Sequence, residues 1–202
     1  TDSDLLRELV RLRIVSNGLE EDLDFKSAWL RLFVSHYKGE ETSQFLIERS
    51  LMRPRFLLNL INHCKSFAIN LNHEIIEGSD IEKGIAAYSA DLLRDIGYEL
   101  QDVSDETEGL LYAFVASSAD LSEQQVMDTL LKSGLDQQKA SRAVDLLLWY
   151  GFLGIRINSD DPKFIYDFSY NKALMDGVKK NSNQAVSLVI NQAFWPALMI
   201  NQ

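Results

Sequence analysis

The sequence is poor in the residues that mark several classes of protein. Cys64 is its single cysteine, which excludes an internal disulfide framework and suits a reducing compartment, so we expect a cytoplasmic protein. No apolar run reaches the roughly 18 residues that a membrane helix needs, and no basic and apolar signal sequence opens the chain. The net charge of −10 argues against broad binding to nucleic acid or anionic lipid, because both depend on a positive surface.

Motifs for catalysis and cofactor binding are also missing. The chain contains no G-x-x-x-x-G-K-S/T, G-x-G-x-x-G or H-E-x-x-H pattern and no paired C-x-x-C. His36, His63 and His73 are too scattered to count as a metal set. Cys64 falls on the apolar side of a predicted helix, where core packing is its expected role. We therefore expect no stand-alone enzyme, and no metal or cofactor bound by this chain alone.

What the sequence does have is helical periodicity, with only three prolines to interrupt it. A helix is predicted over residues 2–16, a second over residues 25–37, and a third after Pro54, whose missing N–H costs nothing in a first helical turn. Ser79-Asp80-Ile81-Glu82 is a capping box that opens a helix ending near Asp102. The first helix carries one apolar stripe: Leu5, Leu6, Leu9, Leu12 and Val15. The third has the clearest helical period: Leu57, Leu60, Ile61, Cys64, Ala68 and Leu71.

The pattern changes after an acidic linker over residues 102–108. Helices are predicted over residues 107–117, from the capping box Ser122–Gln125 to Ser133, and from Asp136 to Tyr150. Two runs typical of strands follow, residues 152–157 and 164–169, separated by a turn. Three helices and then a β-hairpin is the order of a winged helix-turn-helix. The predicted fold is mainly α, with a helical lid-like bundle over residues 1–103 and a winged-helix domain with a C-terminal extension over residues 104–202.

Arg53-Pro54-Arg55 lies at the start of the third helix. The backbone there already presents unpaired N–H groups and a partial positive charge, so two cations are unfavourable unless something negative lies opposite. One interpretation is that both arginines pair with acids such as Glu48 or Glu99. The other is that an arginine here binds an anion such as a phosphate, because its planar fork matches phosphate oxygens in a bidentate manner.

Residues 51–93, from LMRPRFLLNL through the helix that opens SDIEKG, resemble the helical lid of AAA+/STAND-type P-loop ATPases. In such lids an arginine beside a proline, often called sensor 2, reaches the γ-phosphate of bound ATP. The resemblance implies that Arg55 is the sensor and Arg53 the second candidate. By the same resemblance, LLRELVRLRI is the helix just after the nucleotide-binding core. The segments FLGIRINSDDPKFIYDFSY and QAFWPALMI are similar to the winged-helix C-terminus of bacterial ATPases of this group, including some from phage-defence loci.

The nucleotide-binding core itself is absent from the chain, which begins at Thr1 rather than Met and is therefore expected to be an excised or processed piece. The resemblance implies a non-catalytic regulatory C-terminal portion of a P-loop ATPase. ATP and magnesium would bind only when the core, in the same or another chain, is present. A lid arginine that engages on closure would convert the nucleotide state into a rigid-body movement.

A winged helix also raises an alternative function, that of a DNA-binding transcriptional regulator. The candidate contacts lie in DQQKASRAVDLLLWYG, at the start of the third predicted helix of that domain: Gln137, Gln138, Lys139, Ser141 and Arg142. Residues 104–180 hold twelve acids against eight bases, a net charge of −4. Because DNA binding draws most of its affinity from phosphate neutralisation, this balance favours docking on the ATPase core or on another protein.

Overall fold

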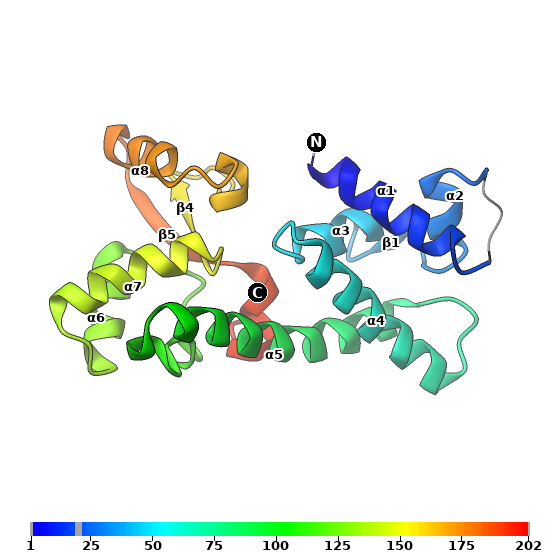
Figure 1. Ribbon diagram of the computed structural model, residues 1–202, viewed down its shortest axis with the longest axis horizontal. Helices are drawn as coiled ribbons and strands as arrows, with labels where there is room; N and C mark the ends of the chain where they lie inside the picture. The colour runs from blue at the N-terminus through cyan, green and yellow to red at the C-terminus, as the bar shows by residue number, and fades with distance from the viewer. Residues whose placement is uncertain (1, 19–21, 202) are drawn as a thin grey trace. The chain divides into compact units, whose positions relative to one another are not determined.

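The computed structural model describes residues 2–18 and 22–201. It is mainly helical with short antiparallel sheets, as the sequence predicts. The chain divides into two compact units, Thr1–Tyr88 and Ser89–Gln202, and the division falls within one long helix, α5 (Gly78–Val103) (Figure 1). The boundary predicted between residues 103 and 104 lies at the C-terminal end of the same helix and stays a prediction. Within the described residues, none of the helices combines the length and the apolar character that a membrane span requires.

The first unit packs α1 (Asp2–Val15), α2 (Phe25–Leu30), α3 (Thr42–Glu48) and α4 (Pro54–Leu71) with the start of α5. The short strands β1 (His36–Tyr37) and β2 (Glu40–Glu41) pair antiparallel, with His36 opposite Glu41. The helix predicted over residues 25–37 therefore ends early, at Leu30, because its last residues belong to β1. The core of the unit is formed by fully or almost fully buried side chains: Trp29, Phe33, Leu46, Phe56, Leu60 and Tyr88.

The apolar stripe predicted on α1 packs on the rest of the unit only in part, through Leu6. Leu6 and Val10 are the buried residues of α1, whereas Leu5 is 71% exposed and Leu12 is 53% exposed. Leu5, Leu9 and Leu12 recur at helical spacing on a separate side of the helix. The helix therefore has one apolar side that contacts its own unit and a second that is largely open to solvent.

Helices α4 and α5 approach closely where Gly84 meets Cys64. A Cβ atom at Gly84 would lie 2.6 Å from Cys64 Sγ and 2.8 Å from both Cα and N of Cys64. The two helices therefore pack backbone against backbone at this point. Cys64 is fully buried, and burial raises the pKa of its thiol to about 12. The prediction that Cys64 is a core residue is confirmed.

The second unit contains a three-stranded antiparallel sheet in the order β3-β5-β4. Strand β3 (Asp120–Leu121) precedes the helices α6 (Glu123–Lys132) and α7 (Gln137–Trp149), and β4 (Leu153–Ile157) follows them. The last strand, β5 (Val186–Ile190), lies between the other two, pairing Leu188 with both Leu121 and Ile155. The capping box Ser122–Gln125 at the start of α6 and the Asp136 cap of α7 are both present, as predicted.

The prediction that residues 164–169 form the second strand of a hairpin is wrong. Residues 164–169 hold a 3-10 helix, η3 (Ile165–Phe168), and β5 pairs with β4 instead. The Asp167 carboxylate accepts a hydrogen bond from the N–H of Phe164 at 2.7 Å, which caps that turn. Ser169 and Tyr170 both have positive φ, which ends any extended run. Between η3 and β5 the chain forms α8 (Lys172–Asn181).

Two further segments complete the second unit. The helix predicted over residues 107–117 is replaced by two 3-10 helices, η1 (Asp105–Thr107) and η2 (Leu110–Phe114). After β5 the chain ends in η4 (Gln192–Phe194) and α9 (Trp195–Leu198). The ring of Phe152 lies 5.4 Å from that of Phe114 and 4.9 Å from that of Phe194, so this last segment closes the core of the unit.

Candidate functional site

A strained turn precedes α4 and fixes the position of the Arg-Pro-Arg motif in the first unit. Leu51 and Met52 both have a φ of 53°, a left-handed conformation that is uncommon for residues with a side chain. Leu51 is buried, and the N–H of Arg53 donates to the Ser50 carbonyl at 3.0 Å. Such residues cost about 1–3 kcal/mol each and cluster at functional sites. The turn is therefore a structural reason, independent of any motif, to examine the residues that follow it.

Arg53 and Arg55 lie against the ring of Phe56 at the mouth of α4. Arg53 is the N-cap residue, with an extended backbone, and Pro54 follows it in the first helical turn. Their guanidinium carbons lie 5.3 Å and 5.1 Å from the centre of the Phe56 ring, within the range of cation–π contacts. The ring is buried, Arg53 is half-buried and Arg55 is exposed. The buried ring thus holds two guanidinium groups at the helix start.

The charge at the mouth of α4 is positive. The first turn of the helix carries Arg55 and no acidic residue, so both guanidinium groups add to the partial positive charge of the helix end. Glu48, one of the acids considered as a partner for the arginines, accepts a hydrogen bond from Gln44 Nε2 at 2.6 Å. Glu99, the other, lies on α5. The end of the helix, taken with its own first turn, therefore favours an anion.

A third arginine, Arg49, lies at the C-terminal end of α3 just before this turn, and no sequence motif marks it. It is only 6% exposed, its guanidinium carbon lies 3.4 Å from the centre of the Phe45 ring, and its Nη1 donates to the Phe45 carbonyl at 3.0 Å. Burial lowers the pKa of Arg49, and the nearby carboxylates of Glu40 and Glu48 oppose that shift. The hydroxyl of Tyr88 donates to the Arg49 carbonyl at 2.9 Å. Arg49 thus links α3 to α5, four residues before the candidate sensor pair.

A buried carboxylate caps the start of α5. Asp80 is fully buried, and its Oδ2 accepts the N–H of Glu77 at 2.9 Å and lies 2.8 Å from His73 Nδ1. The hydrogen bond to Asp80 raises the pKa of His73. The helix therefore starts earlier than the capping box Ser79–Glu82 predicts. Helix α5 begins at Gly78, and the Asp80 carboxylate caps the N–H of Glu77, the residue just before the helix. In the part of the chain that the structure describes, no three side chains of the metal-binding types gather in one place.

The candidate DNA-contact residues lie together at the start of α7. All five, Gln137, Gln138, Lys139, Ser141 and Arg142, are exposed. Lys139 Nζ lies 2.6 Å from Glu106 Oε1, and this hydrogen bond raises the pKa of Lys139. Lys172 of α8 lies 3.0 Å from Asp145 Oδ1 of α7. Two cations on or beside α7 are thus engaged by carboxylates, with which DNA phosphates would have to compete.

Comparison with known proteins relates both units to a longer protein. Residues 4–97 match the model of the FunZ-associated C-terminal helical domain, a match that includes the Arg-Pro-Arg motif. The chain is also 26% identical over 190 residues to the putative transposon gamma-delta 80.3 kDa protein of Escherichia coli (strain K12). That alignment covers 86% of this chain and 26% of the relative, so the chain spans about a quarter of the relative's length. No solved structure matches the chain.

Proposed function

We propose that this chain is the regulatory, non-catalytic C-terminal portion of a longer P-loop ATPase, and that Arg55 senses the bound nucleotide. The observation that carries the proposal is the pair of guanidinium groups held on Phe56 at the positive end of α4. The similarity of residues 4–97 to a C-terminal helical domain, and the greater length of the E. coli relative, both support a position at the end of a longer protein. Arg53 is the second candidate for the same role.

The free energies of the two contacts open to Arg55, with the Phe56 ring and with a phosphate, would allow it to change from one to the other. A cation–π contact is worth about 0.5–1 kcal/mol at an exposed site, whereas hydrogen bonds to a charged group contribute about 1.5–3 kcal/mol. Arg55 could therefore leave the Phe56 ring for a γ-phosphate when the first unit closes over a nucleotide-binding core. Helix α4 and the strained turn before it fix the backbone of Arg55. A change of partner from the Phe56 ring to a phosphate would therefore require the whole unit to move. ATP and magnesium would be bound by the core.

For the second unit we propose a winged helix that docks on the ATPase core or on another protein. The order of its elements, η2, β3, α6, α7, β4 and β5, with β5 between the other strands, supports that fold. The segment between β4 and β5, which contains η3 and α8, would then be an enlarged wing. The ion pair between Lys139 and Glu106 and the excess of acidic residues favour a protein partner over DNA.

A DNA-binding transcriptional regulator is the second candidate, favoured by the five exposed polar residues at the start of α7. In that case the chain should bind labelled duplex DNA in a salt-dependent manner. Lys139→Glu and Arg142→Glu should each weaken binding and reduce the salt slope by about one. Flat titrations at low salt would dismiss this candidate.

The proposed function is tested by the coding sequence that precedes Thr1 in the natural gene. We expect a G-x-x-x-x-G-K-S/T motif within roughly 300 residues upstream. The protein expressed with that segment should hydrolyse ATP, and the 202-residue chain alone should not. A natural gene without such a motif, or turnover that is unchanged when the present chain is deleted, would contradict the proposal.

A further inference from the structure

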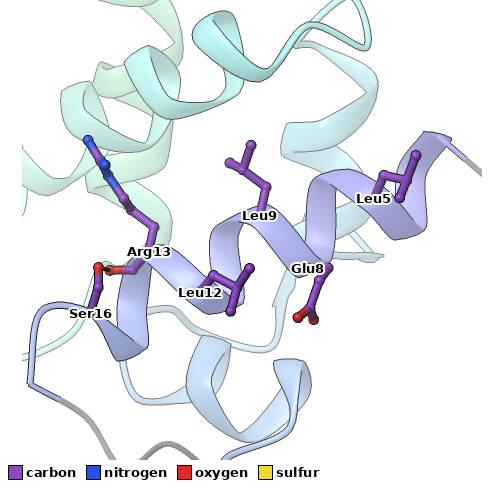
Figure 2. Close-up of a pocket in the computed structure, with 6 residues that line it drawn as sticks. All are labelled: Leu5, Glu8, Leu9, Leu12, Arg13 and Ser16. Carbon is purple, nitrogen blue, oxygen red and sulfur yellow. Dashed lines mark hydrogen bonds between the residues drawn. The ribbon is translucent and has the colours of Figure 1, made fainter.

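The open side of α1 is an apolar surface that the proposed function does not use. Five residues of α1 and the residue just after it line a shallow hollow of about 470 Å³ on the first unit: Leu5, Glu8, Leu9, Leu12, Arg13 and Ser16 (Figure 2). We call this set the α1 seam. Leu5 and Leu12 are mostly exposed, so the largest contributors to the seam gain little from their own unit.

The spacing of the α1 seam is that of a coiled-coil contact. Leu5, Leu9, Leu12 and Ser16 follow one another at intervals of four, three and four residues, which places them at alternating a and d positions of a heptad. Glu8 then occupies a g position and Arg13 an e position, one on each flank of the apolar line. In coiled coils the e and g charges select the partner and its orientation.

We propose that α1 is a self-association helix, through which two copies of this chain pair in parallel along the α1 seam. In a parallel pair each g residue lies beside the e residue five positions later in the partner, so Glu8 of each copy would meet Arg13 of the other. Leu5, Leu9 and Leu12 would each pack against their own counterparts. The seam is thus complementary to itself in charge as well as in apolar character.

The charges also disfavour the opposite orientation. In an antiparallel pair, g positions face g positions and e positions face e positions, so Glu8 would lie beside Glu8 and Arg13 beside Arg13. The Glu8 carboxylate accepts hydrogen bonds from Arg11 Nε and Nη2 of its own helix at 2.8 Å and 2.7 Å, so Arg13 of the other copy would share it with Arg11. Two heptads are a short contact, so we expect a weak dimer that forms only at high protein concentration.

Sedimentation equilibrium of the 202-residue chain, from about 10 μM to 1 mM, measures this association directly. Leu12→Asp should raise the dissociation constant at least about tenfold, because it removes an apolar contact and places like charges together. The matched control is Leu174→Asp on α8, since Leu174 is 52% exposed and Leu12 53%. A chain that is monomeric throughout the range, or equal effects of the two substitutions, would overturn the proposal.

The proposed charge pairing has its own test. Glu8→Arg and Arg13→Glu should each weaken the dimer, and the double reversal should restore it to within about threefold of the wild type, because the pair is remade with opposite polarity. A double variant as weak as its single parents would contradict the pairing of Glu8 with Arg13.

Orientation is tested by cross-linking. Ser16→Cys should form a covalent dimer with itself under mild oxidation, because the two positions are neighbours only in a parallel pair. Ser66→Cys on α4 is the matched control, since both serines are exposed and both donate to a carbonyl of their own helix. Cys64, the native cysteine, is buried and should not compete. Cross-linking of Ser16→Cys no faster than that of the control would rule out the parallel seam.

Discussion

Gly84→Ala is the substitution whose effect the structure defines most sharply. The added Cβ would lie 2.8 Å from both Cα and N of Cys64, whereas ordinary contacts begin at 3.4 Å. Rotation of a side chain cannot relieve contacts to backbone atoms. Helix α4 would therefore have to move away from α5 by about 0.6 Å, the difference between those two distances.

The cost of that movement can be estimated. A gap of 0.5–1 Å forfeits about a quarter to a half of the dispersion energy of each contact across the interface. Overpacking of this kind costs about 1–3 kcal/mol, and backbone contacts place Gly84→Ala near the upper value. Alanine recovers about 1 kcal/mol through its better helix propensity. The free energy of unfolding of the first unit should therefore fall by about 2 kcal/mol, the difference between these terms.

Urea unfolding followed by circular dichroism measures this loss. The matched control is Gly97→Ala on the same helix, where a Cβ meets no atom of the described residues within 4 Å. That control should be neutral or stabilise by up to about 1 kcal/mol. Adding Cys64→Ala should not rescue Gly84→Ala, because Cα and N of residue 64 remain in place. Rescue by Cys64→Ala, or a Gly84→Ala variant as stable as the control, would refute the backbone contact.

Two further predictions concern the same unit. Because the pKa of His73 is raised in the folded state, its pairing with Asp80 stabilises the protein below the unfolded pKa of about 6.5 and is lost as the pH rises through the folded value. His73→Gln should flatten the pH dependence of the urea midpoint in that window and His36→Gln should not; equal slopes would contradict the pairing. Tyr88→Phe should cost about 1–2 kcal/mol of unfolding free energy, because the buried Arg49 carbonyl loses its donor. Tyr98→Phe, at an exposed position of the same helix, should stay within about 0.5 kcal/mol, and equal losses would remove the Tyr88 hydrogen bond from the account.

Helices with strong local determinants could be predicted from the sequence. Pro54 begins α4 as expected, and the period of that helix identified Leu57, Leu60, Cys64 and Ala68 as core residues. The caps at Ser122 and Asp136 were also predicted correctly, because a capping interaction involves residues only three apart. On α1 the period alone could not show which of two apolar sides faces the unit, since that depends on the neighbours that α1 meets.

The sheet of the second unit required information that local patterns do not contain. β5 pairs with β4 across the 28 residues that separate the two strands, residues 158–185, and nothing in residues 186–190 specifies that partner. The η3 segment was mistaken for a strand because it is rich in aromatic residues. Phe164, Ile165 and Phe168 are buried at the spacing of a helical turn, and the polar residue between them, Asp167, serves as a cap.

The candidate site could be predicted only in part. The Arg-Pro-Arg motif is visible in the sequence, and its position at a helix start follows from Pro54. The contact of both arginines with Phe56 is also local, because residues 53, 55 and 56 are adjacent. The buried Arg49, its contact with Phe45 and its link to Tyr88 on α5 depend on tertiary packing, as does the burial of Asp80.

The central claim is that Arg55 contacts a nucleotide phosphate, and ATP turnover by the protein that includes its upstream segment tests it most directly. Arg55→Ala should lower kcat by about 10²–10³-fold, because it removes a charged donor from the transferring phosphate. Arg31→Ala, at an exposed position just after α2, is the matched control and should leave kcat unchanged. Normal turnover in Arg55→Ala would contradict the claim, and a loss in Arg53→Ala alone would move the role to Arg53.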